Sequence, residues 1–294
     1  MTVLGVGRGP AALGPVELSL DEMQYLLELL RIDEVPVVLD AIGRYDHITA
    51  HDAAMAAAAA SLTERGLLDE EMVHRDLVDR LRALYLPHWV LAVRWYVGDR
   101  VNRCCVARGD ELVAVVLRGP DSYVVDEATH DLPGTVLAAL GPAEPLEISG
   151  TNALTTDLKT ILRDTADVDA TTERLTRACT PARDARTLAT ALVEIHSHAS
   201  VVGVVYGEGT REISDGTVAV YNTRNGRFLG TTTHAHDGVP WTSLAAGTPA
   251  RLRTAVKDLI DRLPLRTGFG PAGRTGQPIG SSTAGSTSAP NGGV

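Results

Sequence analysis

Hydrophobic and polar residues alternate along two separate stretches of the chain. Four alternating segments, separated by glycine-containing turns, make up the first stretch: residues 89–97, 101–108, 111–118 and 121–126. Alternation with a period of two, interrupted by such turns about every ten residues, predicts an antiparallel meander of four strands. Asp131 and Pro133 then begin a short helix that runs to Leu140. The first stretch therefore predicts a small sheet followed by a closing helix.

The second stretch repeats this order. Its predicted strands are residues 201–206, a strand that ends at Asn222, residues 227–233, and a short strand around Trp241. Asn225–Gly226 is a strong hairpin signal, because a tight two-residue turn needs residues that tolerate positive φ. Thr248 as N-cap and Pro249 at the first helical position begin the closing helix, whose apolar residues fall on one stripe.

Helical patterns precede both meanders. Ser19 and Glu22 have the spacing of a capping box, an alanine-rich helix runs from Thr49 to Leu62, and a third helix follows it. Before the second meander, residues 151–198 predict three more helical segments. We place the last of these from Thr180–Pro181 to about Ile195, with His196 and His198 at its end. The sequence thus predicts an α+β fold built from two copies of one unit.

The boundaries of this fold follow from the turns and from composition. We expect an N-terminal α+β subdomain over residues 15–141 and a C-terminal α+β subdomain over residues 142–265. Residues 266–294 are rich in Gly, Ser, Thr and Pro and have almost nothing to bury, which predicts a disordered tail. Residues 1–14 predict a flexible leader. The 44% hydrophobic content is sufficient for a substantial core in the remaining chain.

Charge and hydropathy narrow the class of partner. The chain has 37 acidic and 27 basic residues, a formal net charge of −10, and its basic residues form no stripe with aromatics. A phosphate polymer would be repelled, so we expect no nucleic-acid partner. No apolar run approaches the roughly 20 residues that cross a bilayer, and no signal-peptide pattern opens the chain. We therefore expect a cytoplasmic protein without membrane insertion.

Candidate chemistry is sparse. His234 and His236 have the spacing that places two imidazoles on one face of a strand, but further ligands are missing and Gly238 begins a turn. A small-molecule or metal-dependent enzyme that uses these two histidines is kept as the alternative function. The sequence has no nucleophile elbow, paired-cysteine motif or phosphate-binding lysine loop. We therefore expect no catalytic residue, no metal and no cofactor.

Motifs spread over about 250 residues resemble the EspG family of cytosolic chaperones, which are associated with type VII (ESX) secretion in mycobacteria and related actinobacteria. Each motif alone is ordinary turn or cap chemistry, and it is their joint order that carries the resemblance. They are Val16–Asp21, Pro36–Leu39, Arg65–Asp69, Pro87–Trp89, Arg94–Trp95, Arg108–Asp110, Leu140–Pro145, Pro181–Arg186, Gly226–Arg227, Trp241, Gly247–Pro249 and Leu259–Pro264.

The resemblance implies two halves related by pseudo-twofold symmetry. It also implies a chaperone that binds the PPE tip of a PE–PPE heterodimer, keeps the pair soluble and directs it to a type VII secretion system without catalysis. In the family the contact involves the sheet, a meander loop and the second helical bundle. Carried onto this chain, the expected partner-binding residues are Trp95, Gly98, Asp99, Arg100, Arg174, Arg177, Arg183 and Arg186.

Two alternatives remain open at this level. Trp95 is either an exposed anchor on the sheet or a core residue. A homodimer formed through exposed sheet edges is a further alternative, because unpaired edge strands can pair with another chain.

Overall fold

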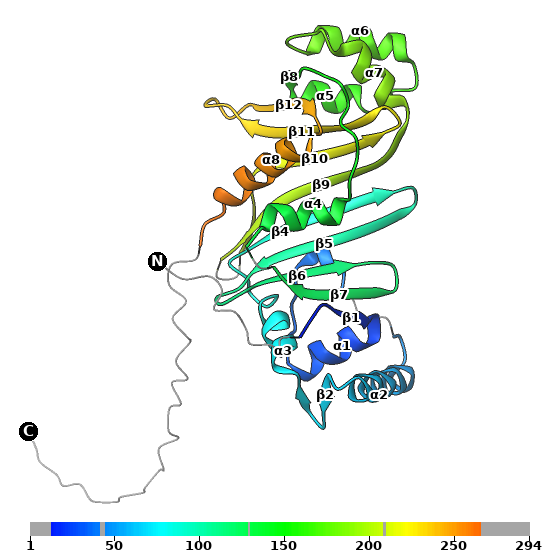
Figure 1. Cartoon of the computed structure of the whole chain (residues 1–294), viewed down its shortest axis with the longest axis vertical. Coiled ribbons are helices and arrows are strands. Elements are labelled where there is room, and N and C mark those ends of the chain that lie inside the picture. Colours follow the sequence, from blue (N-terminus) through cyan, green and yellow to red (C-terminus); the bar gives the residue numbers. More distant parts are fainter. Residues whose placement is uncertain (1–12, 42–44, 129, 208–209, 266–294) are drawn as a thin grey trace, which may run out of the picture.

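The computed structural model describes residues 13–41, 45–128, 130–207 and 210–265. Within these residues, ten strands form one antiparallel sheet that runs the length of the molecule (Figure 1). Its strand order is β1-β7-β6-β5-β4-β9-β10-β11-β12-β8. Two helical groups lie at opposite ends of the long axis, with α1, α2 and α3 at one end and α5, α6 and α7 at the other.

The first half of the chain supplies one side of this sheet. Strand β1 (Val16–Ser19) leads directly into α1 (Leu20–Leu29), and the predicted capping box between Ser19 and Glu22 is present. The remaining elements of this half are the 3-10 helix η1 (Val37–Leu39), α2 (Ile48–Glu64), the hairpin β2 (Leu68–Asp69) and β3 (Met72–Val73), α3 (Arg75–Arg82), the meander β4 (Trp89–Val97), β5 (Arg100–Arg108), β6 (Val113–Arg118) and β7 (Ser122–Glu127), and α4 (Leu132–Leu140).

The second half supplies the other side in the same order. Its elements are β8 (Thr151–Leu154), α5 (Thr155–Ile161), α6 (Val168–Ala178), α7 (Ala185–Val193), the meander β9 (Ile195–Tyr206), β10 (Arg211–Thr223), β11 (Gly226–His234) and β12 (Pro240–Ala246), and α8 (Pro249–Asp261). Thr248 caps α8 and Asp131 caps α4 as predicted, each accepting a backbone N–H of its helix.

The two predicted meanders join into a single sheet. Strands β4 and β9 pair antiparallel over nine residue pairs, from Trp89↔Val205 to Val97↔Ser197. On each side of this junction the first strand of the half, β1 or β8, pairs with the last strand of its own meander. The strand order therefore reads the same from both edges. The α+β class and the repeated layout are confirmed, and the pseudo-twofold relation stays a prediction.

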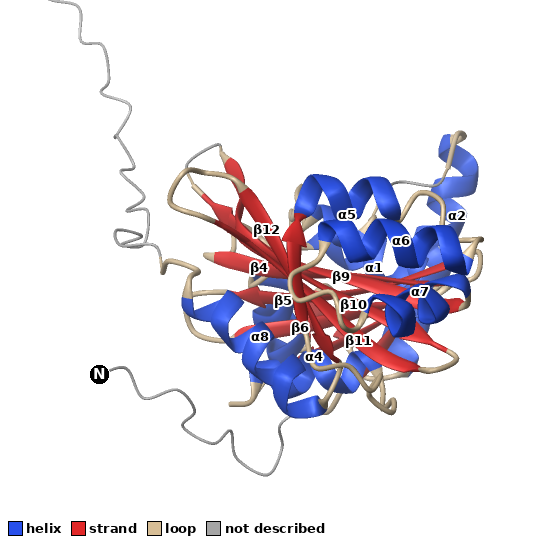
Figure 2. Cartoon of the chain, turned by 90° about the horizontal axis from the view of Figure 1, so that it is seen from above, coloured by secondary structure: helices blue, strands red, loops and turns tan. Residues whose placement is uncertain are grey.

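The two faces of the sheet carry different helices. Face A, the face of Val90, Val116 and Phe228, is covered by α1–α3 at one end and by α5–α7 at the other. Face B, the face of Leu91 and Val201, is covered by α4 and α8. Figure 2 shows α4 and α8 on one side of the sheet and α5, α6 and α7 on the other. Three hydrophobic cores result, of which the face B core spans both halves.

The segment that joins the halves is held by buried polar groups. The Asp184 carboxylate, 8% exposed, accepts the backbone N–H groups of Ser149 at 2.9 Å and Gly150 at 2.8 Å. The Arg227 guanidinium, which burial leaves with a lowered pKa, donates to the Leu140 carbonyl at 3.2 Å, at the end of α4. These bonds fix the path of the segment between α4 and β8, because each buried group needs its partner.

The structure corrects three sequence-based predictions. The helix expected from Thr180–Pro181 begins instead at Ala185 and ends at Val193. Residues 195–200 belong to β9, so His196 and His198 lie on one strand face and not at a helix end. Strand β8, at Thr151–Leu154, was missed because it was counted as the start of a helix.

Both predicted terminal segments fall largely outside the description. Residues 1–12 of the expected leader and the expected tail at 266–294 are not among the described residues. Leu13 and Gly14 are described, and their carbonyls accept hydrogen bonds from Arg80 of α3.

Candidate functional site

The middle of face A is left uncovered between the two helical groups. We call this surface the open strip and define it by nine residues on three central strands: Ala92, Arg94 and Tyr96 of β4, His198, Ser200 and Val202 of β9, and Thr217, Ala219 and Tyr221 of β10. Each of these side chains is half-buried or exposed, whereas their face B neighbours Val93, Val201 and Val220 are buried. In this part of the sheet, face B is packed against a core and face A is accessible, so face A is available to contact another molecule.

A row of aromatic rings crosses the open strip. Tyr96 stacks on His198 with centroids 4.6 Å apart, and His198 lies 6.4 Å from Tyr221, which stacks on Phe228 at 4.7 Å. The four residues are direct cross-strand partners on β4, β9, β10 and β11. Tyr96 is half-buried and His198 is exposed, whereas the row ends beneath the C-terminal helices, where Phe228 is 1% exposed. Burial raises the pKa of Tyr221.

An apolar cavity borders the end of this row. It has a volume of about 120 Å³ and lies between α5–α7 and strands β10–β12. Leu158, Leu188, Tyr221 and Phe228 contribute to its wall, and Leu162, 37% exposed, belongs to the same lining. The open strip therefore continues into a hydrophobic recess of the C-terminal helical group.

Trp95 lies on the opposite face from the open strip. Its ring packs against the face B core, and its indole nitrogen is buried without a hydrogen-bond partner among the described residues. It contributes, with Leu117 and Leu140, to a cavity of about 230 Å³. Of the two readings left open by the sequence, this placement favours the core.

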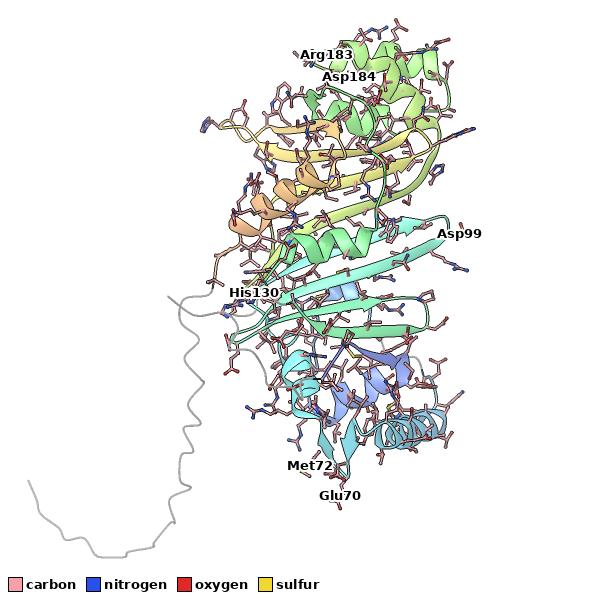
Figure 3. All side chains as sticks on the ribbon, viewed as in Figure 1. Glu70, Met72, Asp99, His130, Arg183 and Asp184 are labelled. Carbon is pink, nitrogen blue, oxygen red and sulfur yellow. The ribbon has the colours of Figure 1, made fainter. Side chains whose placement is uncertain are left out.

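The predicted loop Gly98–Arg100 is a tight hairpin turn. Gly98 has φ of +56°, Asp99 forms the tip, and Arg100 already belongs to β5. Figure 3 shows Asp99 at the end of the β4–β5 hairpin, projecting from the sheet. The turn begins two residues beyond Tyr96 of β4, so it borders the open strip at the Tyr96 end of the aromatic row.

The four predicted arginines lie on the C-terminal helical group in different states. Arg174 donates to the Asp164 carbonyl, Arg177 pairs with Glu173, and Arg186 pairs with Asp169. Arg183 is exposed, has no ion pair within the described residues, and lies at the far end of the group (Figure 3). The structure does not bring these residues together with the open strip into one cluster, and their role stays a prediction.

The candidate histidine pair is not a metal site by geometry. Strand β11 ends at His234, which contacts Asp215, while His236 lies in the turn beyond the strand. The expected shared strand face is therefore absent. In the described part of the chain, no group of three or more His, Cys, Asp or Glu residues could hold a metal ion.

The sequence missed the aromatic row for an identifiable reason. His198 was assigned to a helix end, and Tyr96 and Tyr221 are far apart in the chain, so nothing in the local pattern brought them together. In the structure, buried Ser197 and Ala199 alternate with exposed His196 and His198, but these mostly polar residues give no hydrophobic alternation in the sequence that would have extended β9 toward the helix.

No described helix has the length and apolar character needed to cross a bilayer.

Known proteins with similar sequence and fold agree with the motif resemblance. Over 261 residues, 85% of this chain and 87% of the relative, the chain is 25% identical to the ESX-1 secretion-associated protein EspG1 of Mycobacterium tuberculosis (strain ATCC 25618 / H37Rv). Its fold resembles that of the M. tuberculosis type VII secretion system chaperone EspG5, solved in complex with a PE25–PPE41 dimer, with a TM-score of 0.69, 19% identity, and coverage of 85% of this chain and 97% of that chain.

The sequence model of the EspG family matches residues 19–258, from the N-cap of α1 to the last turns of α8. The match spans both helical groups, both meanders and the strip between them. The resemblance expected from the motifs is confirmed, and the chain belongs to the EspG family.

Proposed function

We propose that this protein is a cytosolic chaperone that binds a PE–PPE heterodimer through the PPE tip and directs it to a type VII secretion system. It keeps the pair soluble by covering an apolar tip that would otherwise aggregate. It acts by binding alone, without catalysis or cofactor. Family membership supports this function, as does the likeness to EspG5, whose structure contains a PE25–PPE41 dimer.

The open strip is the observation that carries the proposal. It leaves Tyr96, Val202 and Tyr221 partly exposed, between helical groups that border it at both ends. Protein interfaces are enriched in such aromatic residues, because a rigid ring provides a large contact area at low entropic cost. A helical tip laid across the strip would contact the sheet and reach the apolar recess beside Leu162.

The partner-binding residues predicted from the sequence form a second part of this proposal. Gly98, Asp99 and Arg100 border the strip at the β4–β5 turn, where they are placed to contact the flank of a bound tip. The arginines of the C-terminal helical group, with Arg183 the one that lacks an ion pair within the described residues, provide long side chains at its end.

Co-expression with each PE–PPE pair of its own genome tests the function. Size-exclusion chromatography with light scattering should detect a 1:1:1 complex with at least one pair. If the chain elutes without a client from every pair, the proposed function is wrong. A stable homodimer whose mass no pair changes would favour self-association instead.

Substitution on the open strip tests the surface. Tyr96→Ala should weaken client binding by about tenfold or more, as truncation of an interface aromatic does. Tyr85→Ala is the matched control, because it removes an exposed tyrosine outside the strip. Titration calorimetry with the purified pair measures both, and equal affinities for the two variants would place the contact elsewhere.

A further inference from the structure

Three arginines stand side by side on face A. Arg94 of β4 is the direct cross-strand partner of Arg103 of β5, and Arg103 is the direct partner of Arg118 of β6. We call these residues the arginine row. Directly opposed side chains in an antiparallel sheet have Cβ atoms about 5 Å apart, so three positive charges are held close together.

The described residues supply one carboxylate to this row. Arg103 pairs with Asp40 at 3.1 Å. Arg118 donates to the Gly119 carbonyl, and its guanidinium lies 5.5 Å from the centroid of the Tyr123 ring. Arg94 has no hydrogen bond or ion pair within the described part of the chain, and its other cross-strand neighbour is Ser200.

This arrangement is costly for the free protein. Like charges directly opposed across a sheet destabilise it. The chain has an excess of acidic residues, with a formal net charge of −10. Even so, Asp40 is the one acidic residue in the described part of the chain that forms an ion pair with the row. Arg94, the member of the row with neither a hydrogen bond nor an ion pair within the described residues, is also the exposed one, and it belongs to the open strip. A bound anionic group would remove the repulsion and gain a charge-assisted hydrogen bond at the same place.

We propose that Arg94 is a specificity-determining residue that binds an aspartate or glutamate carboxylate on the client's tip. The inference rests on the proposed function and adds a chemical requirement to it: clients of this chaperone carry an acidic side chain where the tip crosses β4. Two residues further along β4 and on the same face, Tyr96 of the aromatic row provides apolar contact. The client carboxylate would accept hydrogen bonds from the planar guanidinium of Arg94, which has no other hydrogen-bond or ion-pair partner within the described residues.

Charge variants of Arg94 test the inference with the PE–PPE pair that co-purifies with the unaltered protein. Arg94→Glu should weaken binding by about tenfold or more, since it places a negative charge against the client carboxylate. Arg94→Gln should also weaken binding, whereas Arg94→Lys should retain more affinity than Arg94→Gln. Arg251→Glu is the matched control, because it makes the same charge change on an exposed residue of α8, on face B.

A charge exchange completes the test. One Asp→Arg or Glu→Arg substitution on the client tip should restore binding to the Arg94→Glu variant and weaken binding to the unaltered protein. If Arg94→Glu binds the pair as tightly as Arg251→Glu does, or if no client exchange restores it, the inference is wrong while the proposed function stands. If the unaltered protein captures no pair, both are wrong. Thermal unfolding of each variant excludes misfolding as the cause.

Discussion

Glu22 links three segments through one carboxylate. It accepts the backbone N–H of Ser19 at 2.7 Å, the Ser61 hydroxyl at 2.8 Å, and the Arg65 guanidinium at 2.8 and 2.9 Å. Burial alone would raise the pKa of Glu22, but these hydrogen bonds and the charge of Arg65 outweigh it and hold the pKa below the usual value of 4.5. The start of α1 is therefore fastened to the end of α2 by a charged group.

A pH dependence follows from this lowered pKa. Stability from Glu22 is fully present above pH 4.5 and is lost as the pH falls from there through the pKa of the folded state. Glu22→Gln should lower the free energy of unfolding at pH 7 by about 1.5–3 kcal/mol, the range for hydrogen bonds to a charged group. It should also flatten the decline below pH 4.5. Urea unfolding across pH measures both effects, with exposed Glu17→Gln as control; parallel profiles for all three proteins would contradict the assignment.

Arg94 has a second consequence at the residue scale, in the protein without a client. Arg94→Glu turns a repulsive cross-strand contact with Arg103 into an attractive one, so the free energy of unfolding should rise by roughly 0.2–1 kcal/mol. Arg251→Glu, which has no opposed arginine on a strand, should show no such gain. Chemical denaturation measures the difference, and a loss of stability in Arg94→Glu would show that the arginine row costs the fold nothing.

At the scale of elements, the β10–β11 hairpin supports the connection between the halves. Gly226 has φ of +129°, and a Cβ atom there would lie 2.6 Å from the Leu146 nitrogen and 2.8 Å from its Cα. Arg227 follows, and its backbone carbonyl accepts the N–H groups of Leu146 at 2.7 Å and Gly247 at 2.8 Å. The glycine is required both by its dihedral angle and by the backbone that passes against it.

Gly226→Ala should therefore destabilise the protein by about 2 kcal/mol or more, because strain at positive φ adds to a clash with backbone. Gly238→Ala is the matched control: its φ is +79°, but no atom lies within 4 Å of the added Cβ. The control should cost only the dihedral strain. Equal melting temperatures for the two variants would mean that the connecting segment can move away at little cost.

The sequence predicted elements well where turns and caps were local. Gly98, Asp131 and Thr248 each marked an element boundary that the structure reproduces to within a residue or two. It failed at β8 and at the start of β9, where polar residues gave no hydrophobic alternation. Those strands are held by pairing with distant neighbours, and tertiary context outweighs local pattern in such segments.

At the scale of the whole molecule, the open strip could not be predicted because it depends on one long-range pairing. The alternation within residues 89–97 and 201–206 shows which side chains share a face, but not that β4 lies beside β9. That pairing places Tyr96 against His198 and Arg94 against Ser200. The resemblance identified the family, while the open strip required the structure.

The continuous sheet predicts cooperative unfolding. The face B core includes Leu91 from the first half and Val201 and Val256 from the second, and Arg253 of α8 pairs with Asp131 at the start of α4. The two halves should therefore lose structure together in one transition. Differential scanning calorimetry and circular dichroism should give coincident midpoints. Two separated transitions, one for each subdomain predicted from the sequence, would contradict this prediction, because the two halves would then unfold independently despite the β4–β9 pairing.

The β4–β9 pairing also has a consequence for either half on its own. Cut between residues 141 and 142, each fragment would present a strand of nine or more residues with no neighbour on one side, next to a bare hydrophobic layer. An unpaired edge strand of this kind pairs readily with the same strand of another copy. Each fragment should therefore form dimers or larger oligomers and not a monomer. In the intact chain each half covers the open strand edge of the other, and the β4–β9 junction lies within the open strip that we propose as the client-binding surface.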